Sequence, residues 1–331
     1  MFSRRTSRRI LLGCGTAAVV LLGTCALTYV ILGPAVSCWQ PDRGPLSAGL
    51  SARTLLSGGE ERCYLLYIPA SMDLRSPSPL VLSLHGFASR PEGQIFLSRW
   101  NEVADREGFV VAYPQGTKFP VRWNSFPASD LAAADDVQFL RDLVGEISRV
   151  TAIDPSRVYI SGMSNGGAMT HLAACEMAEV FAAAGVVAGP AMDPPGGCRP
   201  SRPISVIGFY GTADPLVSYE GGELMDRVPQ GAAPQASAVR YLGAVEWAAS
   251  WARRNECNPQ PETVFAQGDT AGVSYPSCRD EAEVILYTVE GGGHAWPGGR
   301  SIPFLGKTTQ DIHASETMWA FFEKHAMQAL P

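Results

Sequence analysis

Charged side chains are scarce in this sequence, and basic ones are in the minority. Lys, Arg, Asp and Glu make up 18% of the 331 residues, and the formal net charge is −6. Proteins that bind nucleic acid carry a basic surplus, so this composition argues against a nucleic-acid partner. The chain also lacks internal repeats and low-complexity tracts. With 46% hydrophobic residues, it can bury one large core.

Common metal-binding patterns are missing as well. Beyond the N-terminal region, no two cysteines have Cys-x-x-Cys spacing, and no two histidines have His-x-x-x-His spacing. These are ligand spacings of common zinc sites. We therefore expect no metal site.

The six cysteines beyond the N-terminal region form an even set, which suits disulfides in an oxidising compartment. They are Cys38, Cys63, Cys175, Cys198, Cys257 and Cys278. Sequential pairing would close three loops of similar length, each worth roughly 3 kcal/mol in the chain-entropy model. We favour pairing 175 with 198 and 257 with 278, among the fifteen pairings that six cysteines allow. Cys38 and Cys63 would form a third bridge unless Cys38 is lipidated.

The N-terminus places positive charge directly before an apolar run. Residues 1–9 contain four arginines, and residues 10–32 carry no charge. Such a run can span a bilayer, and its basic flank directs the downstream part of the chain outward. Arg8 and Arg9 resemble a twin-arginine signal, and residues 35–37 fit a cleavage site. We predict that residues 1–37 are an export signal or membrane anchor, so that the protein is secreted or anchored with its catalytic domain outside. It would touch a membrane only through this segment, if uncleaved.

The remaining chain is predicted to be a linker and one α/β domain. Residues 38–60 are rich in Gly, Pro and Ser and read as a linker, whereas residues 61–331 form the predicted catalytic domain. In this domain Val- and Ile-rich runs alternate with amphipathic stretches, which is typical of a mostly parallel central sheet flanked by helices on both faces. The predicted strands are 79–84, 109–113, 157–161, 181–188, 204–210 and 283–289. The predicted helices are 95–107, 136–150, 165–178, 239–254 and 312–325.

Ser164 has the surroundings of an activated nucleophile. It lies in Gly162-Met163-Ser164-Asn165-Gly166, between a predicted strand and a predicted helix. A serine on such a sharp turn needs small neighbours two positions away on both sides, because strand and helix nearly collide there. The Gly-x-Ser-x-Gly pattern alone is weak, and its strand-turn-helix context makes Ser164 the candidate.

Five histidines compete for the role of base, which a serine hydroxyl needs near neutral pH. His294 alone lies in a Gly-rich loop directly after a late strand. For the acid that orients the base, Asp214 follows the strand 204–210 and should emerge at the same sheet edge as Ser164. The order Ser, Asp, His is the one that α/β-hydrolases use. The alternatives are structural. His294 could be a turn residue whose ring bonds only to backbone groups, and Asp214 could simply form an Asp-Pro turn.

An acyl-transfer site also needs donors for the developing oxyanion. We assign the first donor to the backbone N–H of Asn165, the residue after the candidate nucleophile and the first residue of a predicted helix. The strand 79–84 ends in His85-Gly86-Phe87, where we assign the second donor to the Phe87 N–H. His85-Gly86 is otherwise a plain strand-to-loop turn.

Seven ordered motifs resemble those of the polyhydroxybutyrate depolymerase and feruloyl esterase group, in carbohydrate esterase family 1 of the α/β-hydrolase superfamily. They are LSLHGF (82–87), YPQGT (113–117), WN (123–124), DDVQFL (135–140), SGMSNGGAM (161–169), FYGTADPLVSYEGG (209–222) and GGGHAWPGG (291–299). The resemblance implies a secreted serine esterase that needs no metal or organic cofactor. It also places the triad on Ser164, Asp214 and His294, and disulfides on the cysteines at 175, 198, 257 and 278.

The substrate is left open by the sequence. The resemblance implies a small or oligomeric ester, either a feruloyl or acetyl ester of plant polysaccharide or a hydroxyalkanoate ester. Residues 223–238 could form a lid or pocket wall. His85, Trp123 and Trp296 could line the substrate pocket, although the two tryptophans could equally pack under loops.

Other functions use the same residues. An acyltransferase or a serine peptidase would keep the triad, and a non-catalytic exported binding protein is the least favoured hypothesis. The sequence does not fix the oligomeric state.

Overall fold

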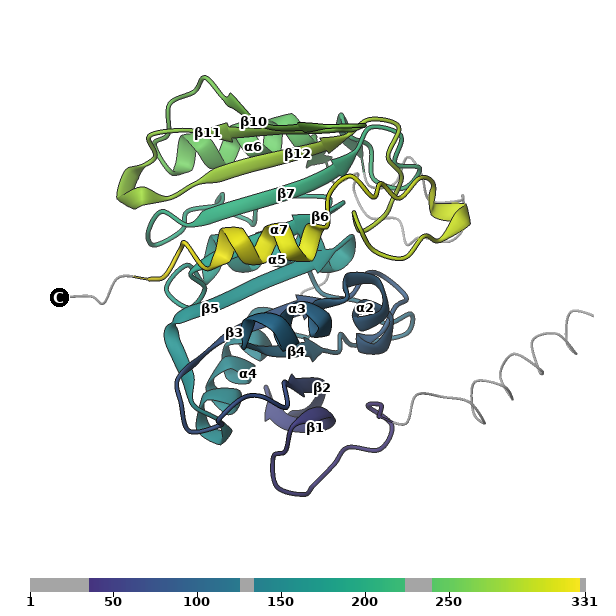
Figure 1. Ribbon diagram of the computed structural model, residues 1–331, viewed down its shortest axis with the longest axis vertical. Coiled ribbons are helices and arrows are strands. Elements are labelled where there is room, and N and C mark those ends of the chain that lie inside the picture. Colours follow the sequence, from purple (N-terminus) through teal and green to yellow (C-terminus); the bar gives the residue numbers. More distant parts are fainter. Residues whose placement is uncertain (1–35, 126–133, 224–239, 328–331) are drawn as a thin grey trace, which may run out of the picture.

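The computed structural model describes residues 36–125, 134–223 and 240–327, and its centre is a ten-stranded sheet (Figure 1). The strands are β1 (Gly49–Ser57), β2 (Glu60–Ile68), β3 (Ser78–Leu84), β4 (Val110–Pro114), β5 (Ile153–Met163), β6 (Ala183–Val187), β7 (Ser205–Gly211), β10 (Glu262–Gln267), β11 (Thr270–Tyr275) and β12 (Val284–Val289). Their order is β1-β2-β4-β3-β5-β6-β7-β12-β11-β10. The strands from β4 to β12 pair in parallel, whereas both ends of the sheet are antiparallel.

Helices cover both faces of this sheet (Figure 1). On one face lie α4 (Asp136–Val150), α5 (Asn165–Glu176) and α6 (Ala244–Arg254), and on the other lie α2 (Pro91–Ser98), α3 (Trp100–Glu107) and α7 (Ala314–Phe322). Smaller elements are the strand pair β8 (Gly221–Glu223) and β9 (Arg240–Leu242) and two 3₁₀ turns, Arg279–Glu281 and Pro303–Leu305. The predicted α/β class, with a mostly parallel sheet between helices, is confirmed.

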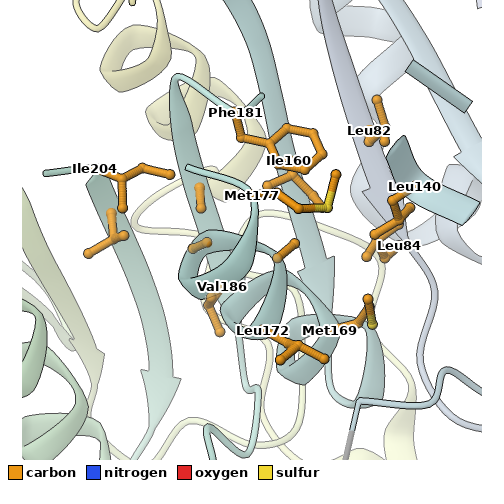
Figure 2. Close-up of a cluster of buried hydrophobic side chains, with 14 of the residues drawn as sticks. Leu82, Leu84, Leu140, Ile160, Met169, Leu172, Met177, Phe181, Val186 and Ile204 are labelled. Carbon is orange, nitrogen blue, oxygen red and sulfur yellow. The ribbon is translucent and has the colours of Figure 1, made fainter. Parts of the chain in front are cut away.

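Two buried clusters form because strand side chains alternate between the faces of a sheet. In β3, Leu82 and Leu84 point into the cluster under α4 and α5, whereas Val81 belongs to the cluster under α3 and α7. Figure 2 shows Leu82 and Leu84 in the first cluster with Ile160 of β5 and Met169 of α5. The sheet is therefore buried on both faces, which explains its near-continuous apolar strands.

The prediction that residues 38–60 are a linker is wrong for their second half. β1 (Gly49–Ser57) lies in this range and pairs along its length with β2. β1 is the edge strand of the sheet and joins β2 through Gly58 and Gly59, which have positive φ values of 58° and 84°. The hairpin contains no Val and only one Ile, the residues that mark a buried strand, so the sequence pattern did not show it.

Other elements also differ from the predictions. The helix predicted over 95–107 is two helices, α2 and α3, separated by Arg99 in the left-handed conformation with φ 56°. The start of the helix predicted over 239–254 is instead the short strand β9, and α6 begins at Ala244. The exposed hairpin of β10 and β11 was not predicted, because five of the six β10 residues are exposed.

Three disulfides join the cysteines in sequential pairs. Cys38 is bonded to Cys63, Cys175 to Cys198 and Cys257 to Cys278. The two favoured pairings, 175 with 198 and 257 with 278, and the third bridge between Cys38 and Cys63 therefore all form.

The described helices are all too short or too polar to cross a bilayer. The predicted apolar run at 10–32 and the predicted pocket wall at 224–238 lie outside the described residues.

Candidate active site

Ser164 lies on a tight turn between β5 and α5. Its backbone has φ 57° and ψ −123°, a conformation that a residue with a side chain rarely adopts. The Ser164 N–H donates a hydrogen bond of 2.9 Å to the Val187 carbonyl of β6. This bond and the adjoining helix hold the hydroxyl at the carboxyl edge of the sheet, where it is partly exposed.

The glycines around Ser164 are required by close backbone contacts. A Cβ at Gly162 would lie 2.3 Å from the Gly166 carbonyl oxygen. One at Gly166 would lie 2.4 Å from the Leu84 carbonyl oxygen of β3. The predicted collision of strand and helix is therefore confirmed at the two positions that the sequence motif named.

His294 and Asp214 form a buried pair. His294 Nδ1 lies 2.7 Å from Asp214 Oδ2, and the other carboxylate oxygen accepts hydrogen bonds of 2.8 Å from the N–H groups of Leu216 and Val217. Both side chains are almost completely buried. Because an ionised carboxylate only accepts, His294 carries its proton on Nδ1, which leaves Nε2 able to accept one.

The loops that carry this pair are bonded to each other. The Ala213 N–H donates to the Gly292 carbonyl over 2.9 Å, and the His294 N–H donates to the Leu305 carbonyl over 2.7 Å. A Cβ at Gly211 would lie 2.3 Å from the Gly292 oxygen, so the two loops touch at a glycine that has no room for a side chain. The position of the imidazole is thus fixed by backbone contacts on both sides.

Ser164, Asp214 and His294 come after β5, β7 and β12 respectively. In the sheet β5 is followed by β6, β7 and β12, all parallel, so the three residues share its carboxyl edge (Figure 1). The structure joins Asp214 and His294 directly and places Ser164 on the same edge, with the end of β6 in between.

The loop after β3 contacts the nucleophile turn. A Cβ at Gly86 would lie 3.4 Å from Ser164 Cβ and 3.9 Å from its Oγ. Within the described residues, no acceptor contacts the N–H of Phe87 or of Asn165. The residues predicted to supply the oxyanion donors thus lie on the Ser164 turn itself and on the loop next to it.

His85 fixes the orientation of the Gly86–Phe87 peptide. Its Nε2 accepts a 3.0 Å hydrogen bond from the Gly116 N–H, so its proton is on Nδ1, which lies 2.8 Å from the Gly86 carbonyl oxygen. Among the described residues only Phe119–Pro120 is a cis peptide. In a trans peptide the C=O and N–H point in opposite directions. Holding the Gly86 oxygen therefore turns the Phe87 N–H away from His85.

Burial lowers the pKa of His85 to about 4, and a nearby Arg90 contributes in the same direction, whereas the bond to Gly86 opposes it. The imidazole is therefore neutral over the physiological range. This matters because protonation of Nε2 would remove the acceptor for the Gly116 N–H.

Asn165 and Trp123 extend this network. The Asn165 amide accepts from the Trp123 N–H over 2.7 Å and donates to the Trp123 carbonyl over 3.2 Å and to Ser125 Oγ over 2.9 Å. The Trp123 indole N–H donates to the His85 carbonyl over 2.9 Å. The side chain that follows Ser164 is thus bonded to the segment that packs against the loop after β3.

The prediction that His85, Trp123 and Trp296 line the substrate pocket is wrong. All three side chains are buried, with exposed fractions of 0%, 2% and 0%. The Trp296 indole donates to Ser315 Oγ over 3.1 Å, and Trp123 stacks on Phe139 in the core. The alternative, that the tryptophans pack under loops, is confirmed. The prediction was based on their sequence positions in or beside the motifs. Their side chains, however, point into the protein.

One cluster has ligand types suited to a metal. It consists of His171, Cys175, Asp193 and Cys198, but the two cysteines are bonded to each other. His171 accepts from the Trp251 indole over 3.3 Å, and Asp193 pairs with Arg254 at 2.6 Å. These groups already have protein partners, so the cluster is a partly buried polar network beside a disulfide.

Comparison with known proteins gives consistent matches. The family model described as esterase PHB depolymerase matches residues 62–194. The putative esterase NocK of Nocardia uniformis subsp. tsuyamanensis is 32% identical over 295 residues, which are 83% of this chain and 83% of that protein.

Two further relatives are longer than this chain. Feruloyl esterase B of Piromyces equi is 32% identical over 247 residues, and the match spans 72% of this chain but only 44% of that protein. Poly(3-hydroxybutyrate) depolymerase of Ralstonia pickettii is 28% identical over 340 residues, covering 96% of this chain and 66% of that protein.

Among solved structures, the acetyl xylan esterase from Aspergillus awamori superposes with a TM-score of 0.56 at 16% identity. The match covers 82% of this chain and 99% of that one. It supports the shared fold.

Proposed function

The chain belongs to the esterase PHB depolymerase family, and from this premise we propose that it hydrolyses carboxylic esters through an acyl-enzyme on Ser164. In this proposal His294 is the general base and Asp214 orients it. The N–H groups of Phe87 and Asn165 bind the oxyanion. The relatives named as esterases support the reaction class, and the Asp214–His294 pair supports the assignment of the base.

The reaction would proceed in two steps. His294 Nε2 takes the Ser164 hydroxyl proton as Oγ attacks the ester carbonyl carbon, and the carbonyl electrons move onto the oxygen that the two N–H groups bind. Collapse of this intermediate expels the alcohol, which receives the proton from His294. Water then attacks the acyl-enzyme with the same base, releases the carboxylic acid and restores Ser164.

Burial of the Asp214–His294 pair is the observation that carries the proposal. A hydrogen bond of 2.7 Å inside the protein fixes the tautomer that can accept a proton at Nε2 and stabilises the imidazolium once it forms. The backbone of Ser164 has the strained turn conformation of an exposed nucleophile. Three disulfides further support action outside the cytoplasm, where residues 1–37 would direct the domain.

The acyl group would be one of those named for the relatives, feruloyl, acetyl or 3-hydroxybutyryl, and a panel of soluble esters would identify it.

The direct test is Ser164→Ala in the full chain. We expect hydrolysis of p-nitrophenyl butyrate to fall by roughly 10⁶-fold, as loss of the nucleophile does in serine proteases. The thermal unfolding midpoint should stay unchanged, and a fluorophosphonate probe should label the unsubstituted protein alone. Retained turnover in the folded variant would remove Ser164 from the mechanism.

A further inference from the structure

The exposed aromatic side chains of the described residues gather at one part of the surface. They are Trp39, Phe87, Phe96, Phe119 and Phe304, here called the aromatic rim. Phe119 is 92% exposed, Phe304 82% and Trp39 69%. Large apolar side chains in contact with water are costly when they form a group, and such groups mark interaction sites.

Contacts between the segments that carry the rim link several of its members. The Arg90 guanidinium lies 5.3 Å from the Trp39 ring, and Arg90 caps α2, which carries Phe96. Arg300, in the loop that carries Phe304, lies 4.6 Å from the Phe96 ring. The rim therefore spans α2 and the loops on either side of it.

The rim also borders the candidate active site. Phe87 follows Gly86, which contacts Ser164, and Phe304 precedes Leu305, whose carbonyl accepts the His294 N–H. The Ala88 N–H donates to the Val121 carbonyl over 2.8 Å, which ties the Phe87 loop to the loop that carries Phe119. A surface that covered the rim would therefore meet the edge where the ester is cleaved.

The N-terminal part of the chain leaves the domain at this same place. Val36 and Cys38 pack against the buried cluster under α3 and α7, and Trp39 lies 5.3 Å from Arg90 at the start of α2. Cys38 lies with Lys118 and Val121 on the wall of a surface groove of about 520 Å³. Residues 10–32, with their arginine-rich flank, precede this exit in the sequence. A segment that entered a bilayer would bring the rim close to it.

The charges on the rim suit an anionic lipid surface. Arg90 and Arg300 each lie over a rim aromatic ring. Aromatic rings flanked by Arg and Lys are typical of the membrane interface, where the ring enters the headgroup layer and the cation meets phosphate. The acidic side chains that line the groove, Glu60 and Glu61, belong to the β1–β2 hairpin and not to the segments that carry the rim.

We propose that the aromatic rim docks on an anionic lipid surface, so that this esterase acts on esters carried by amphiphiles at that surface. The inference rests on the proposed function for the identity of the reaction, but the docking itself is a property of the rim. It extends the proposal from soluble esters to substrates whose acyl or alcohol group is anchored in lipid.

Fluorescence can test the docking without any catalysis. Trp39 is the exposed one of the seven tryptophans, and the other six are buried. In a Trp39→Phe background of the full chain, Phe304→Trp and Val264→Trp each introduce one exposed indole, the second on β10 at the far end of the sheet. Vesicles of phosphatidylcholine and phosphatidylglycerol with brominated acyl chains should quench the emission from position 304 and leave that from position 264 unchanged.

A second measurement compares rates. The double variant Phe119→Ser, Phe304→Ser should lose about tenfold or more in hydrolysis of an ester embedded in these vesicles, relative to its rate on soluble p-nitrophenyl butyrate. The matched control is Val150→Ser, Val264→Ser, which removes two exposed apolar side chains elsewhere and should keep the ratio of the two rates.

The outcomes separate the two proposals. Equal quenching at 304 and 264, a rim signal that depends on protein concentration without lipid, or binding to polyhydroxybutyrate particles but not vesicles would overturn lipid docking. Quenching confined to position 304 in a protein that hydrolyses no ester would support docking and overturn the proposed function.

Discussion

The loop after β3 and the loop after β12 each place a buried histidine at the carboxyl edge of the sheet, but the two rings have different partners. Both ring nitrogens of His85 are bonded to backbone groups of Gly86 and Gly116. In His294, Nδ1 is paired with the Asp214 carboxylate, and no other described residue bonds to the ring. Burial and position therefore do not identify a base. In the proposed function, His294 is distinguished as the base by the carboxylate on one ring nitrogen and by a second nitrogen with no partner among the described residues.

The largest effect in this comparison is expected at the β12 loop. His294→Gln should lower kcat for p-nitrophenyl butyrate by roughly 10⁶-fold, because no other group takes the Ser164 proton. Circular dichroism should show an unchanged fold. If kcat fell less than tenfold, the base would have to be another residue.

Asp214→Asn should cost on the order of 10⁴ in kcat, because an amide facing His294 Nδ1 favours the tautomer that cannot accept the proton. Asp193→Asn is the matched control, since Asp193 also contacts a buried histidine, His171, at 3.4 Å. The control should retain activity within a few-fold of the parent. Similar losses in both variants would mean that the effect is structural.

Replacing His85 tests whether the β3 loop positions a donor. His85→Ala should lower kcat by roughly 10² to 10³ with little change in KM, the cost of losing one oxyanion donor. His85→Asn should recover most of the loss, because its amide N–H can reach the Gly86 carbonyl as Nδ1 does. A change in KM alone, or no recovery with Asn, would contradict the positioning role.

The smallest expected effect concerns stability at acid pH. The pKa of His85 falls from 6.5 to about 4 through burial, so between these values the unfolded chain binds a proton that the folded chain does not. The free energy of unfolding should therefore decrease by about 3 kcal/mol as the pH falls from 6.5 to 4. Burial lowers the pKa of His171 too, so this residue also makes the free energy of unfolding decrease as the pH falls.

Urea unfolding at several pH values measures this dependence. The slope between pH 6.5 and 4 should become shallower in His85→Asn, which has no titrating group at this position. An equal slope in both proteins would show that His85 is not held neutral in the folded state.

Local patterns carried most of what could be predicted from the sequence. The turn at Ser164 depends on Gly162 and Gly166, which are close in the chain, so the motif itself contained the steric reason. The strand order brought Asp214 and His294 to one edge, because carboxyl ends of parallel strands align. The buried strands were also recognisable, since both of their faces are apolar.

Contacts between distant loops could not be predicted in the same way. The function of His85 depends on the Gly116 N–H, 31 positions later, and the sequence contains no signal that pairs them. The hairpins at the two ends of the sheet were missed because β1 and β2 contain little Val or Ile and five of the six β10 residues are exposed. The break at Arg99 depends on a left-handed residue that is not glycine, which propensity alone does not indicate.

The two ends of the described chain leave the domain on opposite sides. Cys38 is bonded to Cys63 beside the loop 116–121, at the edge that carries Ser164. The Met327 N–H instead donates to the Ser156 carbonyl, near the start of β5. A support attached beside residue 36 should therefore face the edge that carries Ser164. A support attached beside residue 327 should leave that edge open to a substrate arriving from solution.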